Sequence, residues 1–316
     1  MRHLTYVCDK QKFFFMEKQE QFDVVIVGGS YAGLSAAMAL GRAIRQVLVV
    51  DTGKPCNYQT PHSHNFLTQD GSTPAAIAAQ AKAQVLAYPT VQFRSEAAVA
   101  ASGENNHFLI TTDAGTTVLA RKLLFATGVR DLMPAIPGFA ESWGISVIHC
   151  PYCHGYEYRG QPTGMLTNGP VAMEWSQLIR NWTDQLTIFT NGEASFSPEQ
   201  RAQLVARQIA VEETPVREII HQDGYLTHIR LADGRQVPLT AFYARPDFEQ
   251  HCALPRLLGC DHNEVGRIVV DAMQKTSLPG IYAAGDATSM MRTVSVAVAG
   301  GPTAGALINH ELLATD

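Results

Sequence analysis

The sequence lacks the features that mark several large classes of protein. No apolar run in its 316 residues approaches the ~18 residues that are needed to cross a bilayer. Charged residues make up only 17% of the chain, the formal net charge is −5, and no long basic run stands out. This charge balance argues against nucleic-acid partners. We therefore expect a globular, cytoplasmic protein with no nucleic-acid and no membrane partner.

Cysteine is also scarce, because six residues are too few for a disulfide scaffold in a chain of this length. At roughly 150 residues per domain, the length predicts two domains or one large one. Residues 1–21 are polar and without pattern, apart from Phe13-Phe14-Phe15. We expect a disordered tail there, and Met16 would serve equally well as the start of the chain.

A strand, a glycine-rich turn and a helix follow this segment. Residues 23–27 form an apolar run of strand length, Gly28-Gly29-Ser30-Tyr31-Ala32-Gly33 ends it, and residues 32–40 carry the small side chains of a closely packed helix. With the next apolar run, residues 47–50, the segment has the length of one strand–helix–strand crossover. This pattern predicts an α/β fold with a helix-covered parallel sheet.

The glycine-rich turn is a candidate dinucleotide site because it follows a strand and opens a helix. Gly28 permits the tight bend, Gly33 permits close packing, and backbone N–H groups at the helix N-terminus can receive a pyrophosphate. A carboxylate at the end of the next strand is expected to accept the ribose hydroxyls. The alternative is a glycine-rich turn with no ligand. The candidate residues here are Gly28, Ser30, which stands where Gly is usual, Tyr31, Ala32, Gly33 and Asp51.

A second unit of the same type lies further along the chain. Apolar strands are expected at residues 163–167 and 186–190, with a helix at residues 171–182 between them. Proline and glycine mark linkers on either side of this unit. We therefore predict two Rossmann-like dinucleotide-binding domains, the second inserted in the first. The first comprises residues 22–133 and 247–316, and the second residues 134–246.

Two other expected strands also end in residues that suit a ligand. Ala126-Thr127-Gly128 follows one of them, and Gly285-Asp286 follows the strand at residues 280–284. A carboxylate at this edge stands where open α/β sheets bind ligands. Taken alone, Asp286 is equally well explained as a turn residue.

Cys150 and Cys153 form a Cys-x-x-Cys pair, which in a reducing compartment is more often catalytic or metal-binding than structural. A second cysteine that faces a helix N-terminus has a depressed thiol pKa, and the flanking His149 and His154 could favour the thiolate or move its proton. Structural zinc is an alternative, although Cys252 and Cys260 lack the spacing of a zinc knuckle. Two unpaired buried thiols are another. Redox chemistry fits the pair best.

Taken in order, these motifs resemble those of the low-molecular-weight thioredoxin reductases, from about Asp23 to Leu313. Cys-Pro-Tyr-Cys-His-Gly-Tyr-Glu is most similar to a branch of that family that includes dithiol oxidases and disulfide oxidoreductases without the ordinary pyridine-nucleotide motifs. The resemblance implies one noncovalent FAD, homodimers, a flavin-facing Cys153 and a Cys150 that exchanges with the substrate. It adds to the FAD site Thr127, Gly128, Gly285, Asp286, Thr293 and Val294. Standard members carry Asp where this chain has His154.

The second unit departs from the nucleotide pattern of the family. Thr167-Asn168-Gly169-Pro170-Val171-Ala172 stands where Gly-x-Gly-x-x-Ala is expected, and Thr190-Asn191-Gly192-Glu193 replaces the His-Arg-Arg cluster that holds the 2′-phosphate of NADPH. No arginine lies in this stretch, and Glu193 would repel the phosphate. We therefore leave open whether the chain binds NADPH in addition to FAD. Either other groups bind it, or the domain mainly presents the dithiol.

Three functions remain open at this point. The first is a disulfide oxidoreductase resembling thioredoxin reductase, which passes electrons between flavin, the Cys150/Cys153 pair and a thioredoxin-like protein or a small dithiol or disulfide. The second is a dithiol oxidase that uses oxygen or another acceptor, and the third is a flavin redox sensor. The polar segment His62-Ser63-His64-Asn65 is expected to be a solvated loop.

Overall fold

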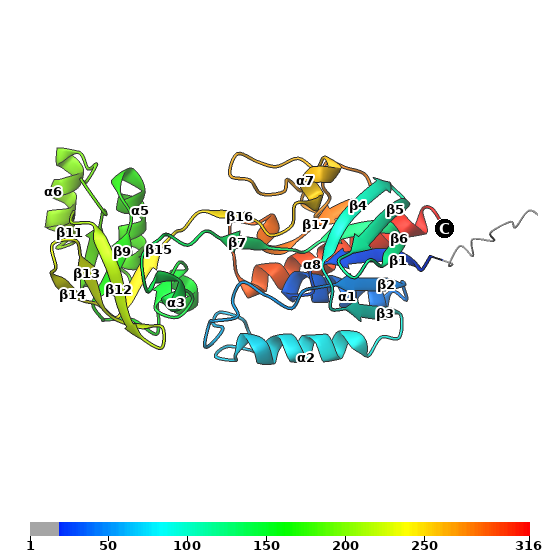
Figure 1. Ribbon diagram of the computed structural model, residues 1–316, viewed down its shortest axis with the longest axis horizontal. Helices are drawn as coiled ribbons and strands as arrows, with labels where there is room; N and C mark the ends of the chain where they lie inside the picture. Colours follow the sequence, from blue (N-terminus) through cyan, green and yellow to red (C-terminus); the bar gives the residue numbers. More distant parts are fainter. Residues whose placement is uncertain (1–18) are drawn as a thin grey trace, which may run out of the picture.

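The computed structural model describes residues 19–316, so most of the predicted tail, residues 1–18, lies outside the described part. The first strand, β1 (Gln21–Val27), begins at the last residue assigned to that tail. Figure 1 shows two lobes joined by a pair of extended segments. The α/β fold with two Rossmann-like units is confirmed.

The first lobe is built on a seven-stranded mixed sheet in the order β3-β2-β1-β6-β5-β4, with β17 paired to the second half of β6. Strands β1, β2, β3, β6 and β17 run parallel, and β4 and β5 form antiparallel pairs. The remaining strands are β2 (Val47–Val50), β3 (Val91–Arg94), β4 (Ala98–Glu104), β5 (His107–Thr112), β6 (Thr117–Phe125) and β17 (Ile281–Ala283).

Helices cover this sheet, and the closest contact is between α1 and α8. A Cβ on Gly301 of α8 would lie 2.3 Å from the carbonyl oxygen of Ala32 in α1, so only glycine permits this approach. The predicted helix 32–40 is observed, slightly extended, as α1. The helices of this lobe are α1 (Tyr31–Arg42), α2 (Pro74–Leu86), α7 (Leu254–Leu258), α8 (Val294–Leu313) and the 3₁₀ turn η1 (Gly285–Ala287).

The second lobe contains a five-stranded parallel sheet in the order β11-β10-β9-β15-β8 and a three-stranded antiparallel sheet. The parallel strands are β8 (Val147–Ile148), β9 (Thr163–Leu166), β10 (Leu186–Phe189), β11 (Ala210–Glu212) and β15 (Ala241–Ala244). The antiparallel ones are β12 (Val216–Gln222), β13 (Tyr225–Leu231) and β14 (Gln236–Pro238). The helices are α3 (Phe139–Ser142), α4 (Pro151–His154), α5 (Gly169–Ile179) and α6 (Pro198–Ala206).

The helix expected at residues 171–182 starts earlier and ends at Ile179. Trp182 therefore does not continue the apolar face of α5. Its ring instead meets the ring of Tyr152 edge-on, with centroids 5.6 Å apart. This contact packs the end of α5 against the segment that carries the two cysteines.

Two short strands connect the lobes. β7 (Val129–Asp131) and β16 (Phe248–Gln250) pair antiparallel, and Arg130 and Glu249 form an exposed ion pair across them. In Figure 1 these strands are the two extended segments between the lobes. The chain leaves the first lobe along β7 and returns along β16.

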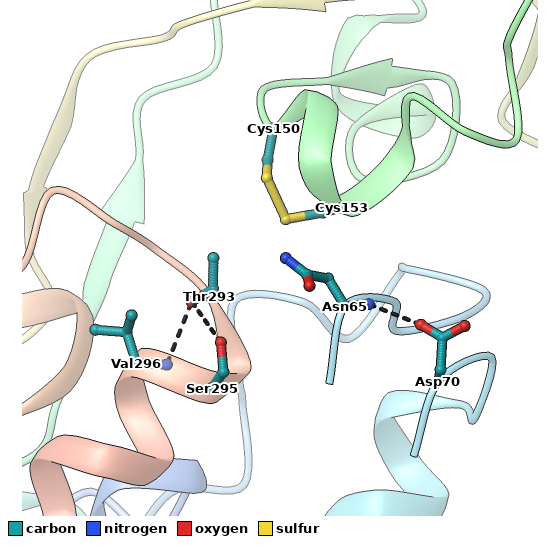
Figure 2. The surroundings of a disulfide bond; sticks show 7 residues. All are labelled: Asn65, Asp70, Cys150, Cys153, Thr293, Ser295 and Val296. Carbon is teal, nitrogen blue, oxygen red and sulfur yellow. Dashed lines mark hydrogen bonds between the residues drawn. A yellow bond between two sulfur atoms is a disulfide. The ribbon is translucent and has the colours of Figure 1, made fainter. Parts of the chain in front are cut away.

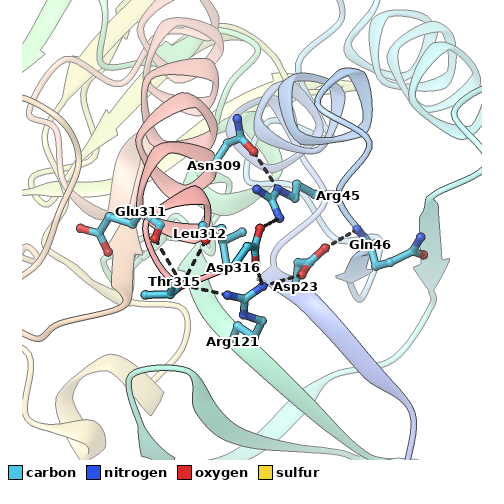
Figure 3. A network of polar contacts seen from close by, with 9 residues as sticks. All are labelled: Asp23, Arg45, Gln46, Arg121, Asn309, Glu311, Leu312, Thr315 and Asp316. Atoms are coloured by element: carbon cyan, nitrogen blue, oxygen red, sulfur yellow. Dashed lines mark hydrogen bonds and ion pairs between the residues drawn. The ribbon is translucent and has the colours of Figure 1, made fainter.

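The C-terminal end of α8 is tied to the first sheet by a polar network (Figure 3). Arg45 pairs with Asp316, and Arg121 pairs with both Asp316 and Asp23. Arg45 Nε also donates to Asn309 Oδ1 at 2.7 Å. Between residues 19 and 316, no helix combines the length and the apolarity that a bilayer span requires.

Candidate functional site

Four parallel strands of the first sheet end side by side. Val27 at the end of β1 pairs with Val50 of β2 and with Phe125 of β6, and Phe125 pairs with Ala283 of β17. The residues that follow these strands therefore meet at one edge of the sheet. This brings together the predicted candidates Gly28, Asp51, Thr127, Gly128, Gly285 and Asp286.

The glycine-rich turn forms a tight cradle at this edge. Gly28 has φ +102°, and a Cβ there would lie 2.4 Å from the carbonyl oxygen of Ala126. A Cβ on Gly33 would lie 1.9 Å from the carbonyl oxygen of Gly28. Ser30 is the N-cap of α1, and within the described chain its side chain makes no capping bond. The first N–H groups of α1, at Tyr31 and Ala32, therefore face a site where an anion can bind.

Asp51 lies beside this turn, as predicted. Its Oδ1 accepts a hydrogen bond from Gly29 N at 2.8 Å, and its Oδ2 accepts one from Gly53 N at 2.9 Å. Each carboxylate oxygen retains a lone pair, because a carboxylate accepts about four hydrogen bonds. The carboxylate is thus fixed in place and can still accept ribose hydroxyls.

The neighbouring strand ends add polar groups. Thr127 Oγ1 is buried and has no hydrogen-bond partner among residues 19–316. Gly128 and Gly285 both have positive φ, and a Cβ on Gly285 would lie 3.1 Å from Ala32 Cβ. Burial raises the pKa of Asp286, against the opposing effect of Arg292, whose Nε lies 3.5 Å from Asp286 Oδ2. A buried hydroxyl without a partner is expected where a ligand supplies the missing bond.

Cys150 and Cys153 form a disulfide, with their Cα atoms 5.3 Å apart. Cys150 is the N-cap of the single-turn helix α4, so the first cysteine, rather than the second, stands at the start of this helix. Figure 2 shows the disulfide facing the start of α8 at Thr293 and the loop that carries Asn65. Thr293 Oγ1 caps α8 by accepting from Val296 N at 3.3 Å. The start of α8 at Thr293 thus lies on the side toward which the disulfide faces.

The two histidines that flank the cysteines are neutral at pH 7. Burial lowers the pKa of His154 to about 4, and repulsion from His64 adds to the effect. Burial, and secondly Arg292, lower the pKa of His149 to about 4. Both imidazoles can accept a proton, and their lowered pKa makes them weaker bases than a free histidine.

The loop from residue 62 to 65 is not simply solvated. His64 Nε2 lies 3.6 Å from Glu157 Oε1, and His64 Nδ1 lies 3.6 Å from Asp70 Oδ1. Asn65 Nδ2 points toward the disulfide in Figure 2. The approach of His64 to Glu157 joins the two lobes, and no local sequence pattern indicates it, because the two residues are about a hundred positions apart.

The second unit offers a different environment at the corresponding turn. Asn168 Oδ1 accepts from Gly169 N at 2.8 Å and from Ser195 N at 2.9 Å, and Asn168 Nδ2 donates to the Glu193 carbonyl oxygen. Pro170, at the next position of α5, has no N–H. One guanidinium does reach this loop from α6: Arg201 Nη2 lies 3.3 Å from the Ala194 carbonyl oxygen. It is paired with Glu213 at 3.0 Å.

The sequence matches one family model, described as pyridine nucleotide-disulphide oxidoreductase, over residues 22–301. The chain belongs to this family. It is 30% identical to thioredoxin reductase sirT of Leptosphaeria maculans and 32% identical to thioredoxin reductase tcpT of Claviceps purpurea. These alignments cover 93% and 92% of this chain, and 95% and 94% of the relatives.

Solved structures of similar proteins share the whole fold. An oxidoreductase from Agrobacterium tumefaciens is 38% identical with a TM-score of 0.87, and covers 94% of this chain and 100% of its own. A putative thioredoxin reductase from Bacillus anthracis is 29% identical with a TM-score of 0.88, covering 93% and 99%. This pyridine nucleotide-disulphide oxidoreductase is thus a FAD-dependent enzyme that acts on sulfur groups, as its motifs implied.

The zinc alternative is not supported by the positions of the other cysteines. Cys252 and Cys260 pack in the core of the first sheet, while Cys150 and Cys153 bond to each other in the second lobe. Across residues 19–316, no three His, Cys, Asp or Glu side chains gather in a metal-binding arrangement. The pair forms a disulfide that faces the first lobe at the start of α8.

Proposed function

We propose that this oxidoreductase runs in the oxidative direction. A substrate dithiol reduces the Cys150–Cys153 disulfide, and the electrons leave through FAD to oxygen or another acceptor without NADPH. The observation that carries the proposal is the contrast between the N-termini of α1 and α5. Among the described residues, Ser30 leaves the first N–H groups of α1 uncapped, whereas Asn168 caps α5 and also binds the loop at Ser195.

This contrast disfavours a nicotinamide dinucleotide in the second lobe. A pyrophosphate at a helix N-terminus needs free N–H groups and a close approach of the backbone. At α5 one N–H is taken by Asn168, one is missing at Pro170, and Ser195 Oγ lies 2.9 Å from where a Gly169 Cβ would be. The loop therefore occupies the place where the phosphates would lie.

The first lobe supplies the FAD site in this proposal. Gly28, Ser30, Tyr31, Ala32 and Gly33 would hold the pyrophosphate, Asp51 the ribose, and Thr127 and Gly128 the adjoining part of the cofactor. Gly285 and Asp286 would hold its ribityl or pyrophosphate portion, and the N–H groups at Thr293 and Val294 would favour negative charge on the reduced ring. We assign residues 22–133 and 247–316 to this FAD-binding domain, and residues 134–246 to the domain that presents the dithiol.

The chemistry of the dithiol balances in two exchanges. A substrate thiolate attacks one sulfur of the disulfide and forms a mixed disulfide, and the second substrate thiol then displaces the protein sulfur. The substrate becomes a disulfide, and Cys150 and Cys153 become thiols. FAD, held by the first lobe, would supply the two-electron acceptor that returns the pair to the disulfide. Oxygen would be the final oxidant, taking up two electrons and two protons as hydrogen peroxide.

Within these steps Cys150 is the sulfur that meets the substrate and Cys153 the sulfur that faces the ring. We assign His154 as the acceptor of the thiol proton, because it directly follows Cys153 and is neutral at pH 7, its pKa being lowered to about 4 by burial. The substrate is a small dithiol or a thioredoxin-like protein, and the enzyme is a homodimer by analogy with its family.

A second candidate is an NADPH-fed reductase that acts on a thioredoxin-like protein. The names of the relatives favour it, and Arg201 is the guanidinium that could meet a 2′-phosphate. Glu213 already pairs with this side chain, and Glu193 stands in the same loop.

Anaerobic titration of the FAD-loaded enzyme distinguishes these functions. NADPH, dithiothreitol and a reduced thioredoxin are added in separate experiments, and bleaching of the flavin absorption is followed in each. We expect bleaching by one or both dithiols and none by NADPH. Rapid bleaching by NADPH would establish the reductase instead, and no bleaching by any reductant would favour a redox sensor.

Cys153→Ser is the matched variant. It should retain FAD at normal stoichiometry but lose bleaching by dithiols and all disulfide turnover, because one sulfur cannot close the disulfide. Retained turnover in this variant would refute the dithiol assignment. NADPH bleaching that survives in Cys153→Ser would show direct reduction of FAD by the nucleotide.

A further inference from the structure

A buried ion pair lies between the two lobes, next to the predicted site residues Asp286 and Thr293 but formed by two residues outside that set. Arg292 Nη1 donates to Asp131 Oδ1 at 2.6 Å, and Arg292 Nη2 donates to Asp131 Oδ2 at 2.9 Å. The Asp131 and Arg292 side chains are only 4% and 12% exposed. Asp131 is the last residue of β7, one of the two connecting strands, and Arg292 directly precedes the N-cap of α8. The ion pair thus links the connecting strand β7 to the first lobe.

Asp131 also holds a residue of the dithiol lobe. Trp143 Nε1 donates to Asp131 Oδ2 at 3.2 Å. The indole stacks on the ring of His149, with centroids 5.7 Å apart and planes 25° apart, and His149 directly precedes Cys150. The Asp131 carboxylate therefore binds Arg292 at the start of α8 and also Trp143, whose ring stacks on the residue before Cys150.

We propose that Asp131 is a positioning residue for the dithiol: through Arg292 and Trp143 it holds His149 and Cys150 in place at the start of α8. The proposal rests on the disulfide chemistry at Cys150 and Cys153, and it is independent of the electron donor. A residue that sets the distance between disulfide and flavin has a large effect on rate, because a displacement of about 1 Å can cost about 100-fold.

The surrounding charges explain why the carboxylate charge is needed. Arg292 has a second acidic neighbour, Asp286, whose Oδ2 lies 3.5 Å from Arg292 Nε. If residue 131 is neutral, the guanidinium is drawn toward Asp286 and away from residue 131. Breaking a buried pair by removing one charge is also more costly than removing an exposed pair. An Asn offers one acceptor oxygen where Asp131 offers two, so Arg292 and the indole of Trp143 compete for it and the ring stacked on His149 is held less firmly.

The test compares two variants of neighbouring residues in the FAD-loaded enzyme. Asp131→Asn removes the charge with little change in volume. Arg130→Gln is the control, because it breaks the exposed Arg130–Glu249 pair on the same strand and touches none of the residues above. FAD stoichiometry and melting temperature are measured first. The rate of anaerobic flavin bleaching by dithiothreitol is then measured by stopped flow.

A second readout does not depend on flavin chemistry. Each protein is reduced, and the rate at which iodoacetamide alkylates Cys150 is followed by mass spectrometry. For Asp131→Asn we expect bleaching to slow at least 10-fold with FAD still bound, and alkylation to rise several-fold. Arg130→Gln should match the parent in both. If Asp131→Asn differs from the parent only in melting temperature, the residue is structural and the proposal is wrong.

Trp143→Phe keeps the test valid if Asp131→Asn does not fold. It removes the indole N–H but retains a ring that can stack on His149 and Phe139. In this single variant we expect slower bleaching and faster alkylation of Cys150, because the hydrogen bond to Asp131 is lost. Parent-like rates in both measurements would overturn the proposal. Where Asp131→Asn folds, the double variant should show less than additive effects, because both changes weaken the same contact. If dithiols fail to bleach even the parent enzyme, the oxidase function fails, while the alkylation comparison still decides the role of Asp131.

Discussion

Replacing Gly28 by Ala tests the geometry of the cradle. From the sequence, a side chain at Gly28 is expected to block the pyrophosphate. The structure shows an earlier obstacle, because the Cβ would lie 2.4 Å from the Ala126 carbonyl oxygen and 2.6 Å from its carbonyl carbon. Both atoms are backbone at the end of β6, so they cannot rotate away. The substitution therefore perturbs the two strand ends before any cofactor binds.

The magnitude follows from two contributions. A non-glycine residue at φ +102° costs about 1–2 kcal/mol of conformational strain. Forcing the ends of β1 and β6 apart costs about 1–3 kcal/mol more, as in overpacked cores. Gly53 is the control position, because it also has a positive φ, +73°, but has nothing within 4 Å of an added Cβ and so lacks the steric contribution. Gly53→Ala is expected to show only the strain.

The assay is urea unfolding of the two apoproteins, followed by FAD titration of each. We expect Gly28→Ala to lower the free energy of unfolding by about 1–3 kcal/mol more than Gly53→Ala does. It should also bind FAD more weakly, because Gly28 and Ala126 border the same site. Equal losses of stability in the two variants would refute the steric argument. Normal FAD affinity in Gly28→Ala would contradict the placement of the cofactor.

Three further predictions concern single side chains. Thr127→Val removes the buried unpartnered hydroxyl, so titration should show FAD affinity reduced by about 1 kcal/mol with unchanged apoprotein stability; unchanged affinity would contradict this. Glu311→Gln leaves Lys122, which is 1% exposed, without its carboxylate and should cost about 3 kcal/mol in urea unfolding. Burial raises the pKa of Glu311, but its hydrogen bonds with Lys275 and Lys122 contribute to lowering it to about 2. The parent should therefore lose stability as pH falls from about 4.5 to 2 and the variant should lose less; equal losses would refute it. Burial, and secondly His64, lower the pKa of His154 to about 4, so the rate of flavin bleaching by dithiols in stopped flow should fall as the pH is lowered toward 4. His154→Gln should make this rate less dependent on pH in the same range; an unaltered pH profile would exclude His154 as proton acceptor.

Six of the parallel strands could be predicted because burial on both faces makes them continuous apolar runs, whereas β3, β8, β11 and β15 were missed. Residues 47–50 are an example, and they form β2 without any shift. The antiparallel strands were missed, since β4 reads Ala-Val-Ala-Ala-Ser-Gly-Glu, which has little β-propensity and is mostly exposed. Helix α8 contains Gly300, Gly301 and Pro302, which oppose helix formation locally. Its close packing on α1 decides the conformation there.

The residues of the candidate site also divide into those that a sequence motif reveals and those that it does not. Motifs that carry their chemistry within a few residues, such as Gly28 to Gly33 and Cys150 to Cys153, are visible in the sequence because the turn or the disulfide is itself local. Asp131 and Trp143 carry no such signal, because their role depends on Arg292, which lies about 150 residues further along the chain. Contacts between lobes arise from the tertiary arrangement, so a single sequence does not show them.

The two strand–helix–strand units of this chain share an architecture but differ in what their turns permit. Both keep a buried core: Val24 and Val49 in the first, and Met165, Ile188 and Tyr243 in the second, are all at most 2% exposed. In the function proposed above, the core of the second unit does not serve nucleotide binding, since Asn168 and its loop stand where the phosphates would lie. That core still has a function, because β8 leads directly into His149 and Cys150. A sheet that presents a redox disulfide to the neighbouring lobe is constrained by position, so this constraint holds whether or not the second unit binds a nucleotide.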